Sequence, residues 1–378
     1  MSDTDMASTS IPVALLTGFL GSGKTTLLNR LINDPALKDT LVLINEFGEI
    51  GLDHHLIQSV DAEMVVMASG CLCCTIQSDL AKTLRQMALK RVRGEVPAFK
   101  RVVLETTGLA DPAPIIHTLM EDPLIGSHYR LDGVITTVDA VTGWQTLDRQ
   151  VEAVKQAAVA DRIVLTKTDL AEGDDGAQLV ARLRRLNPGA PILTAAAGEA
   201  TAERLFDAGL YDPATKSLDA QRWLNAEAYE APEHEHGHGH DHDHGHDHDD
   251  HAHGADAQDP HDVNRHDKRI HATCLTIDEP LDWDGFALWA QSLAAYRGED
   301  LLRLKALINV KGNDKPVAVH GVQHLFHPPA ELPAWPSDDR RSRIVLITRD
   351  MSREMLEDSL KKCLSTSALP PADAFKDA

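Results

Sequence analysis

The sequence is poor in cysteine, in aromatic residues and in positive charge. Five cysteines in 378 residues are too few for a disulfide-stabilised scaffold, and aromatic residues make up only 4% of the chain. The 37 Lys and Arg residues face 58 Asp and Glu residues, which gives a formal net charge of −21. Binding nucleic acid without sequence preference requires a basic surface, so the charge argues against that class of protein. A nucleotide, which a few local groups can hold, stays open.

Long apolar runs are also missing. No apolar segment approaches the ~20 residues that a bilayer crossing needs, and the longest near the N-terminus, Ile11–Leu20, breaks into a glycine-rich turn. Residues 1–10 carry two Asp and no basic residue, so they do not resemble the start of a signal peptide. We therefore expect a cytoplasmic protein with neither a membrane nor a nucleic acid as partner.

What the sequence does contain is a series of short, β-branched apolar runs at the spacing of strands alternating with helices. The runs begin at Val13, Leu41, Arg101, Gly133, Arg162 and Pro191. They are nearly continuous in apolar character, as strands covered on both faces should be. This pattern predicts an α/β fold with a doubly wound, mainly parallel sheet. After His271 the pattern becomes β-α-β-β-β-α, which predicts a smaller α+β domain with Trp283 and Trp289 in its core.

A tract of His, Asp, Glu and Gly separates the two regions. Residues 231–267 hold eleven Asp and Glu and one Arg, so about half of the net charge is local to this tract. It has no apolar material to bury and is expected to be a flexible linker. The predicted organisation is a flexible N-terminus (1–10), a doubly wound α/β domain (11–225), a disordered His/Asp-rich linker (226–268), an α+β domain (269–365) and a flexible tail (366–378).

The strongest motif is the sequence GFLGSGKT at residues 18–25, which matches G-x-x-x-x-G-K-[ST]. It follows an apolar strand and precedes a helix, which is the context that a P-loop requires. Its glycines allow backbone N–H groups to face phosphates, Lys24 reaches the β and γ oxygens, and the Thr25 hydroxyl can hold Mg²⁺. A chance glycine-rich turn is the alternative. The residues expected to bind the nucleotide here are Gly18, Gly21, Ser22, Gly23, Lys24, Thr25 and Thr26.

A second motif indicates which base is bound. Thr166, Lys167, Thr168 and Asp169 follow directly on an apolar strand. At this place the Asp169 carboxylate would accept hydrogen bonds from the N1–H and 2-amino groups of guanine, a donor pair that adenine lacks. The motif therefore favours GTP over ATP, with Thr166, Lys167 and Asp169 as the contacts. The alternatives are an ordinary surface turn at these residues, or an ATP-driven kinase that uses the same P-loop.

The strand from Arg101 ends in an acid, Glu105, and is followed by Gly108. It resembles a Walker B strand with Glu in place of Asp, in which the longer side chain acts on Mg²⁺ through a water. Gly108 is placed to present its N–H to the γ-phosphate, and the alternative is an ordinary strand end with a solvated Glu. Lys24 and Glu105 are thus the candidate catalytic residues. Since no arginine finger or catalytic glutamine is evident, we expect slow intrinsic turnover.

Three of the five cysteines, Cys71, Cys73 and Cys74, fall within four residues. Three thiolates can converge on one soft cation such as Zn²⁺ or Cu(I), and less tightly Co²⁺, leaving one tetrahedral position for another ligand. Two alternatives remain. The cysteines could be small buried apolar residues, or Cys71 and Cys74, with C-x-x-C spacing, could form a redox pair.

Together the motifs resemble one family over about residues 11–365. GFLGSGKT, NEFGEIGLD, GCLCC, ETTGLADP, TKTD and a His-rich linker before a small domain are similar to the CobW-type GTPase metallochaperones, which include the zinc-regulated GTPases. The resemblance implies a GTPase whose C-x-C-C metal site is coupled to the nucleotide state and which delivers a metal, often zinc, to client metalloproteins. It places the metal ligands at Cys71, Cys73 and Cys74, with Glu46 as an additional candidate.

The cofactors implied are GTP and GDP, Mg²⁺ and Zn²⁺, with Co²⁺ or another divalent metal as an alternative. A different metal would make the protein a cobalt chaperone for cobalamin synthesis or an activator of an iron, cobalt or nickel enzyme. A third interpretation is a metal buffer, since ten of the twenty residues 234–253 are His. A solvated spacer is the alternative interpretation of this tract, and loose storage or capture of metal at many sites is the favoured one. The partners expected are client apo-enzymes, and the chain is expected to be a monomer or a dimer that depends on nucleotide or metal.

Overall fold

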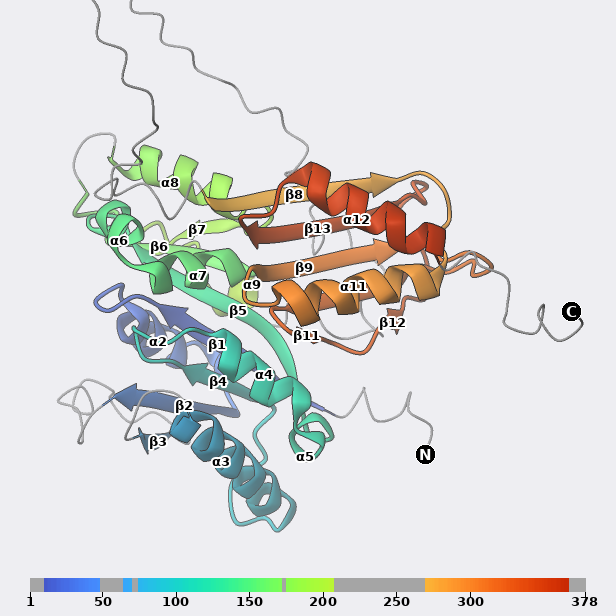
Figure 1. The fold of residues 1–378 in the computed structure, drawn as a ribbon. Coiled ribbons are helices and arrows are strands. Elements are labelled where there is room, and N and C mark those ends of the chain that lie inside the picture. The colour runs from blue at the N-terminus through green and yellow to red at the C-terminus, as the bar shows by residue number, and fades with distance from the viewer. Residues whose placement is uncertain (1–9, 48–63, 70–73, 172–174, 207–268, 367–378) are drawn as a thin grey trace, which may run out of the picture.

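The computed structural model describes residues 10–47, 64–69, 74–171, 175–206 and 269–366. The N-terminal region forms a seven-stranded sheet in the order β3-β2-β4-β1-β5-β6-β7, in which every neighbouring pair is parallel (Figure 1). Its strands are β1 (Ile11–Gly18), β2 (Thr40–Phe47), β3 (Met64–Ser69), β4 (Arg101–Glu105), β5 (Tyr129–Asp139), β6 (Arg162–Thr166) and β7 (Ile192–Thr194). The sequence predicts all of these except β3.

Helices cover both faces of this sheet, as the apolar runs require. They are α2 (Lys24–Ile32), α3 (Cys74–Val92), α4 (Ala113–Glu121), α5 (Pro123–Gly126), α6 (Gly143–Arg149), α7 (Val151–Val159), α8 (Asp175–Leu186) and α9 (Ala202–Leu205), with a 3₁₀ turn η1 (Pro35–Leu37). Successive strand residues point to opposite faces. Leu15 packs in the core under α3 and α4, and its neighbour Leu16 packs in the core under α2 and α9. Helices exclude water from both faces of the sheet, so the side chains at both Leu15 and Leu16 must be apolar.

The second sheet is antiparallel, in the order β11-β10-β9-β13-β8, with β12 paired to β10. The elements are β8 (Ile270–Ile277), α11 (Trp283–Arg297), β9 (Leu301–Ile308), β10 (Val317–Val322), β11 (Leu325–Phe326), β12 (Ala330–Glu331), β13 (Ser342–Arg349) and α12 (Arg353–Thr366). Figure 1 shows α11 and α12 on one face of this sheet. Trp289 is buried in the core between them and the sheet, and Trp283 packs at its border. The predicted α+β domain is confirmed, apart from the short strands β11 and β12.

The opposite face of the antiparallel sheet packs against the parallel-sheet domain. Leu302 of β9 and Ile347 of β13 belong to the same buried cluster as Val154 of α7 and Leu179 of α8. Within the described residues, no helix has the length and apolar character needed to span a bilayer. The linker predicted at 226–268 lies outside the described residues, so its boundaries and its disorder stay predictions.

Candidate functional site

The P-loop connects β1 to α2, and its backbone explains its glycines. Gly18, Gly21 and Gly23 have φ values of 140°, 73° and 91°, which favour glycine. At Gly18 a β-carbon would lie 2.3 Å from Oγ1 of Thr137 on β5, so no side chain fits. No side chain caps the first turn of α2. Such a helix start, with its N–H groups aimed at the loop, is suited to an anion.

Lys24, the first residue of α2, is nearly buried and lies against the loop. Its Nζ donates hydrogen bonds to the carbonyl oxygens of Gly18, at 2.9 Å, and Phe19, at 3.2 Å. The ammonium group is therefore held by the same loop that is expected to bind phosphate. Phosphate oxygens are stronger acceptors for an ammonium donor than these neutral carbonyls, because their charge assists the hydrogen bond.

Thr25 and Glu105 meet at the carboxyl ends of β1 and β4. Thr25 Oγ1 donates a hydrogen bond of 2.7 Å to Oε1 of Glu105. Glu105 is only 4% exposed, which is against the interpretation of a solvated strand end. A hydroxyl and a carboxylate are the oxygen ligands that Mg²⁺ prefers, so the two side chains fit this ion.

The loop after β4 lies directly on the P-loop. A β-carbon at Gly108 would lie 2.5 Å from the amide nitrogen of Leu20, so only glycine permits this contact. Two residues earlier, Thr106 donates from its amide to Leu16 O at 2.9 Å and from its hydroxyl to Thr17 Oγ1 at 2.9 Å. The two loops therefore form one packed unit, and a displacement of one must displace the other.

The loop after β6 is also bonded to the P-loop. Thr166 Oγ1 donates to Ser22 O at 2.7 Å, and Lys167, at φ 55°, donates from Nζ to Gly21 O at 2.8 Å. Lys167 also binds Oδ2 of Asp139 at 2.7 Å. Burial would raise the pKa of Asp139, but the hydrogen bonds from Lys167 and from two backbone N–H groups hold it below its usual value. Asp169 is exposed beyond this anchored turn.

The structure thus brings together most of the nucleotide residues that the sequence predicts. The P-loop, Glu105, Gly108, Thr166 and Lys167 form one connected unit, while Thr26 is exposed on α2. Sequence reasoning missed Asp139. The only signal for it was an acid at the end of the apolar run from Gly133.

The predicted metal motif falls mostly outside the described residues. Cys71 and Cys73 lie there entirely, and for Glu46 on β2 and Cys74 at the start of α3 the backbone alone is described. β2 and β3 are parallel neighbours, with Glu46 opposite Ala68. The backbone of Glu46 therefore lies near the edge of the sheet where β1 and β4 end. Across the described ranges, no three His, Cys, Asp or Glu side chains gather into a metal site.

Two family models match the chain. The one described as CobW/HypB/UreG, nucleotide-binding domain, covers residues 12–194. The one described as the cobalamin synthesis protein cobW C-terminal domain covers residues 270–364. These ranges correspond to the parallel-sheet region and to the antiparallel domain.

Curated relatives are similar over nearly their whole length. The zinc chaperone YjiA of Escherichia coli is 30% identical, over 91% of this chain and 96% of its own. The zinc-regulated GTPase metalloprotein activator 1 of Schizosaccharomyces pombe is 28% identical, over 93% of this chain and 85% of its own. The crystal structure of Zn(II)-bound YjiA GTPase from Escherichia coli superposes with a TM-score of 0.66 at 26% identity, covering 94% of this chain and 99% of that one.

Proposed function

The chain belongs to the CobW/HypB/UreG family, and we propose that it is a GTP-hydrolysing metallochaperone that couples its nucleotide state to the transfer of zinc to client metalloproteins. The observation that carries the GTPase part is the bonding of Thr166 and Lys167 to the P-loop carbonyls, which makes the guanine loop and the phosphate loop one unit. The zinc part rests on relatives that are named as zinc chaperones. A reducing cytoplasm, which keeps thiols available as ligands, is the compartment that we infer.

Each residue of the site has a definite task in this proposal. Lys24 leaves the carbonyls of Gly18 and Phe19 for the β and γ oxygens and stabilises the charge that develops there. Thr25 and Glu105 would hold Mg²⁺, which when bound neutralises phosphate charge. Gly108 presents its N–H to the γ-phosphate. Because Gly108 also touches Leu20, γ-phosphate contact fixes both loops together.

Zinc is the cargo, and Cys71, Cys73 and Cys74 are its proposed ligands, with Glu46 as a fourth. Thiolates bind Zn²⁺ well, and three of them leave one tetrahedral position that Glu46 can fill and give up, which lets the ion leave again. The nucleotide state sets how tightly these ligands hold the ion: GTP favours zinc binding and hydrolysis favours its release, as in other nucleotide switches.

The test of this proposal is thermodynamic reciprocity. If a non-hydrolysable GTP analogue tightens Zn²⁺ binding, Zn²⁺ must tighten binding of the analogue by the same factor, expected to be about 5–150-fold. Titration calorimetry of the analogue with and without Zn²⁺ measures this factor. An unchanged affinity in the native protein would rule out the coupling.

Two variants locate the coupled zinc. Cys73→Ser should abolish the effect of Zn²⁺ on nucleotide affinity, whereas deletion of residues 234–253 should leave it intact. The opposite pattern, coupling that disappears with the deletion and survives in Cys73→Ser, would identify a metal buffer in place of a chaperone.

Asp169→Asn should change base preference from guanine to xanthine. An amide can donate to the 2-oxo group of xanthine, but it cannot accept both guanine donors as a carboxylate does. Loss of a hydrogen bond to a charged group costs about 1.5–3 kcal/mol, so affinity for GTP should fall about 10–150-fold while xanthosine triphosphate gains. Competition binding with both nucleotides and ATP measures the change. Asp278→Asn, at a side chain 81% exposed in the antiparallel domain, is the matched control.

A further inference from the structure

Helix α7 lies between the nucleotide loops and the antiparallel domain. In Figure 1 one end of α7 meets the start of β9, and the buried side chain of Val154 shares a core with Leu302 of β9. Only nine residues long, α7 is a rigid rod of less than three turns. Buried and half-buried polar groups of α7 contact both neighbours, from the middle of the helix to the loop after β4 and from its C-terminal end to the antiparallel domain.

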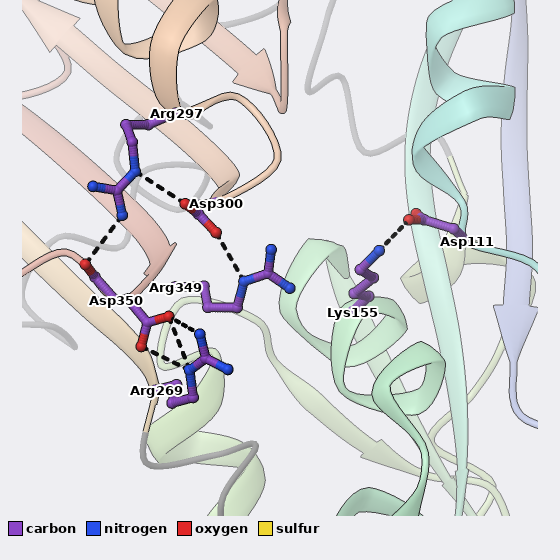
Figure 2. A network of polar contacts seen from close by, with 7 residues as sticks. All are labelled: Asp111, Lys155, Arg269, Arg297, Asp300, Arg349 and Asp350. Atoms are coloured by element: carbon purple, nitrogen blue, oxygen red, sulfur yellow. Dashed lines mark hydrogen bonds and ion pairs between the residues drawn. The ribbon is translucent and has the colours of Figure 1, made fainter.

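On one side, consecutive residues of α7 hold the loop that follows β4. Gln156 is fully buried, and its Nε2 donates to Ala110 O at 2.9 Å and to Gly108 O at 3.3 Å. Lys155 Nζ binds Oδ2 of Asp111 at 2.8 Å, as Figure 2 shows. The loop that meets the P-loop at Gly108 is therefore held by α7 through two adjacent side chains.

The burial of Gln156 is costly in itself. Its Oε1 is buried and has no hydrogen-bond partner among the described residues. An apolar side chain of similar volume would avoid the cost of desolvating this oxygen. The amide of Gln156 is therefore better explained by the loop that its Nε2 positions, through Gly108 O and Ala110 O, than by a contribution to stability.

At the other end, α7 is bonded to the antiparallel domain. Val159 O, the last carbonyl of α7, accepts a hydrogen bond from Arg303 of β9. A cation is favourable at this place because the helix dipole is negative at the C-terminus. Two residues on, the buried carboxylate of Asp161 binds Arg303 and also Lys305 Nζ, at 3.1 Å. Its Oδ2 accepts from the amide of Val134 on β5 at 3.0 Å.

Strand β9, which receives these contacts, is held in turn by ion pairs to α11 and β13. Asp300, immediately before β9, binds Arg297 Nε at 2.9 Å and Arg349 Nε at 2.8 Å (Figure 2). Arg297 ends α11 and Arg349 ends β13. A displacement applied to β9 through Arg303 therefore moves α11 and β13 with it.

We propose that Gln156 is a positioning residue that couples the γ-phosphate site to the antiparallel domain through α7 and Arg303. When GTP moves the loop at 106–111, Gln156 and Lys155 carry the displacement along α7 to β9. The nucleotide state then sets how the antiparallel domain is held. This inference rests on the proposed GTPase function and assigns its internal route.

A double-mutant cycle tests the route. The quantity measured is the ratio of the dissociation constants for GDP and for a non-hydrolysable GTP analogue, in the full-length chain. By reciprocity, Arg303→Met, which is remote from the nucleotide, should change this ratio at least about fivefold. In a Gln156→Met background the same Arg303→Met change should have no further effect, because the link is already broken.

Lys155→Met provides a second variant, since its side chain is 25% exposed and its loss is compatible with folding. Like Gln156→Met, it should reduce the effect that Arg303→Met has on the ratio of dissociation constants. Lys100→Met, which removes the exposed ion pair with Asp39, is the matched control and should leave the effect of Arg303→Met on this ratio unchanged.

Hydrogen exchange separates failure of the route from failure of the function. In the native protein, amides of both the 106–111 loop and β9 should exchange differently with the analogue and with GDP, and in Gln156→Met only the loop should respond. The route would be overturned if the effects of the two substitutions on the ratio were strictly additive, or if exchange in β9 did not depend on the nucleotide while exchange in the loop did. Neither result would contradict the proposed GTPase function. A loop that ignores the nucleotide, in a chain that binds no GTP, would overturn the proposed function itself.

Discussion

Lys24→Ala should lower kcat/KM for GTP by about 10²–10³-fold, the loss typical when one preorganised electrostatic group is removed from a transition state. Lys24 is the only P-loop side chain expected to bring a full positive charge to the phosphates. Its present bonds to Gly18 O and Phe19 O hold that charge at the loop before any ligand arrives. The rate of phosphate release under single-turnover and steady-state conditions measures the loss.

Two comparisons protect this result from misinterpretation. Lys90→Ala, at an exposed position on α3, removes the same charge from the chain and should leave turnover unchanged. Circular dichroism should show native secondary structure in Lys24→Ala, because the bonds to Gly18 O and Phe19 O join the lysine to its own loop. Turnover within threefold of the native rate would exclude Lys24 from the chemistry.

The fold could be predicted from sequence because its strands are buried on both faces. Neighbours such as Leu15 and Leu16 enter different cores, so each strand is a continuous apolar run that needs no knowledge of its partners. β3 was missed because a six-residue apolar run does not by itself distinguish strand from helix. The two-residue strands β11 and β12 exist only through pairing with β10, which no local signal encodes.

The site, like the fold, has parts that local sequence predicts and parts that depend on contacts between distant residues. The P-loop could be predicted because eight consecutive residues carry its geometry. The bond of Ser22 to Thr137 joins residues 115 positions apart, and that of Lys167 to Asp139 joins residues 28 apart. Both depend on β5 lying between β1 and β6, an order that apolar patterning does not give. Gln156 was missed for a related reason, since a polar residue in a helix is ordinarily solvent-facing.

The buried ion network between the domains yields the second large effect. Asp161→Asn should destabilise the protein by about 3–5 kcal/mol, because it removes the negative charge that Asp161 supplies to two buried cations. Burial would raise the pKa of Asp161, but the charges of Arg303 and Lys305 hold it well below its usual range. Burial, together with the charge of Arg303, lowers the pKa of Lys305 to about 8. Urea unfolding at neutral pH measures the loss.

The pH dependence of this loss follows from Lys305. Its pKa is depressed in the folded state and ordinary, about 10.4, in the unfolded chain. Between these values the unfolded state binds more protons, so raising the pH stabilises the fold. Without Asp161 the ammonium is more strongly disfavoured, so this gain is larger in the variant. The difference from the native protein should therefore shrink as the pH rises from about 7 to about 10.

Removing all three charges distinguishes the ion network from simple packing. A chain with Asp161→Leu, Arg303→Met and Lys305→Met has no buried charge at this point and should recover most of the stability lost in Asp161→Asn. Glu331→Gln, which breaks the exposed pair with Lys315, should leave the unfolding midpoint unchanged. If the network joins the domains, Asp161→Asn should also split one unfolding transition into two, because each sheet keeps its own core. A single transition and a loss below about 1 kcal/mol would mean that the apolar contacts of Leu302 and Ile347 alone hold the interface.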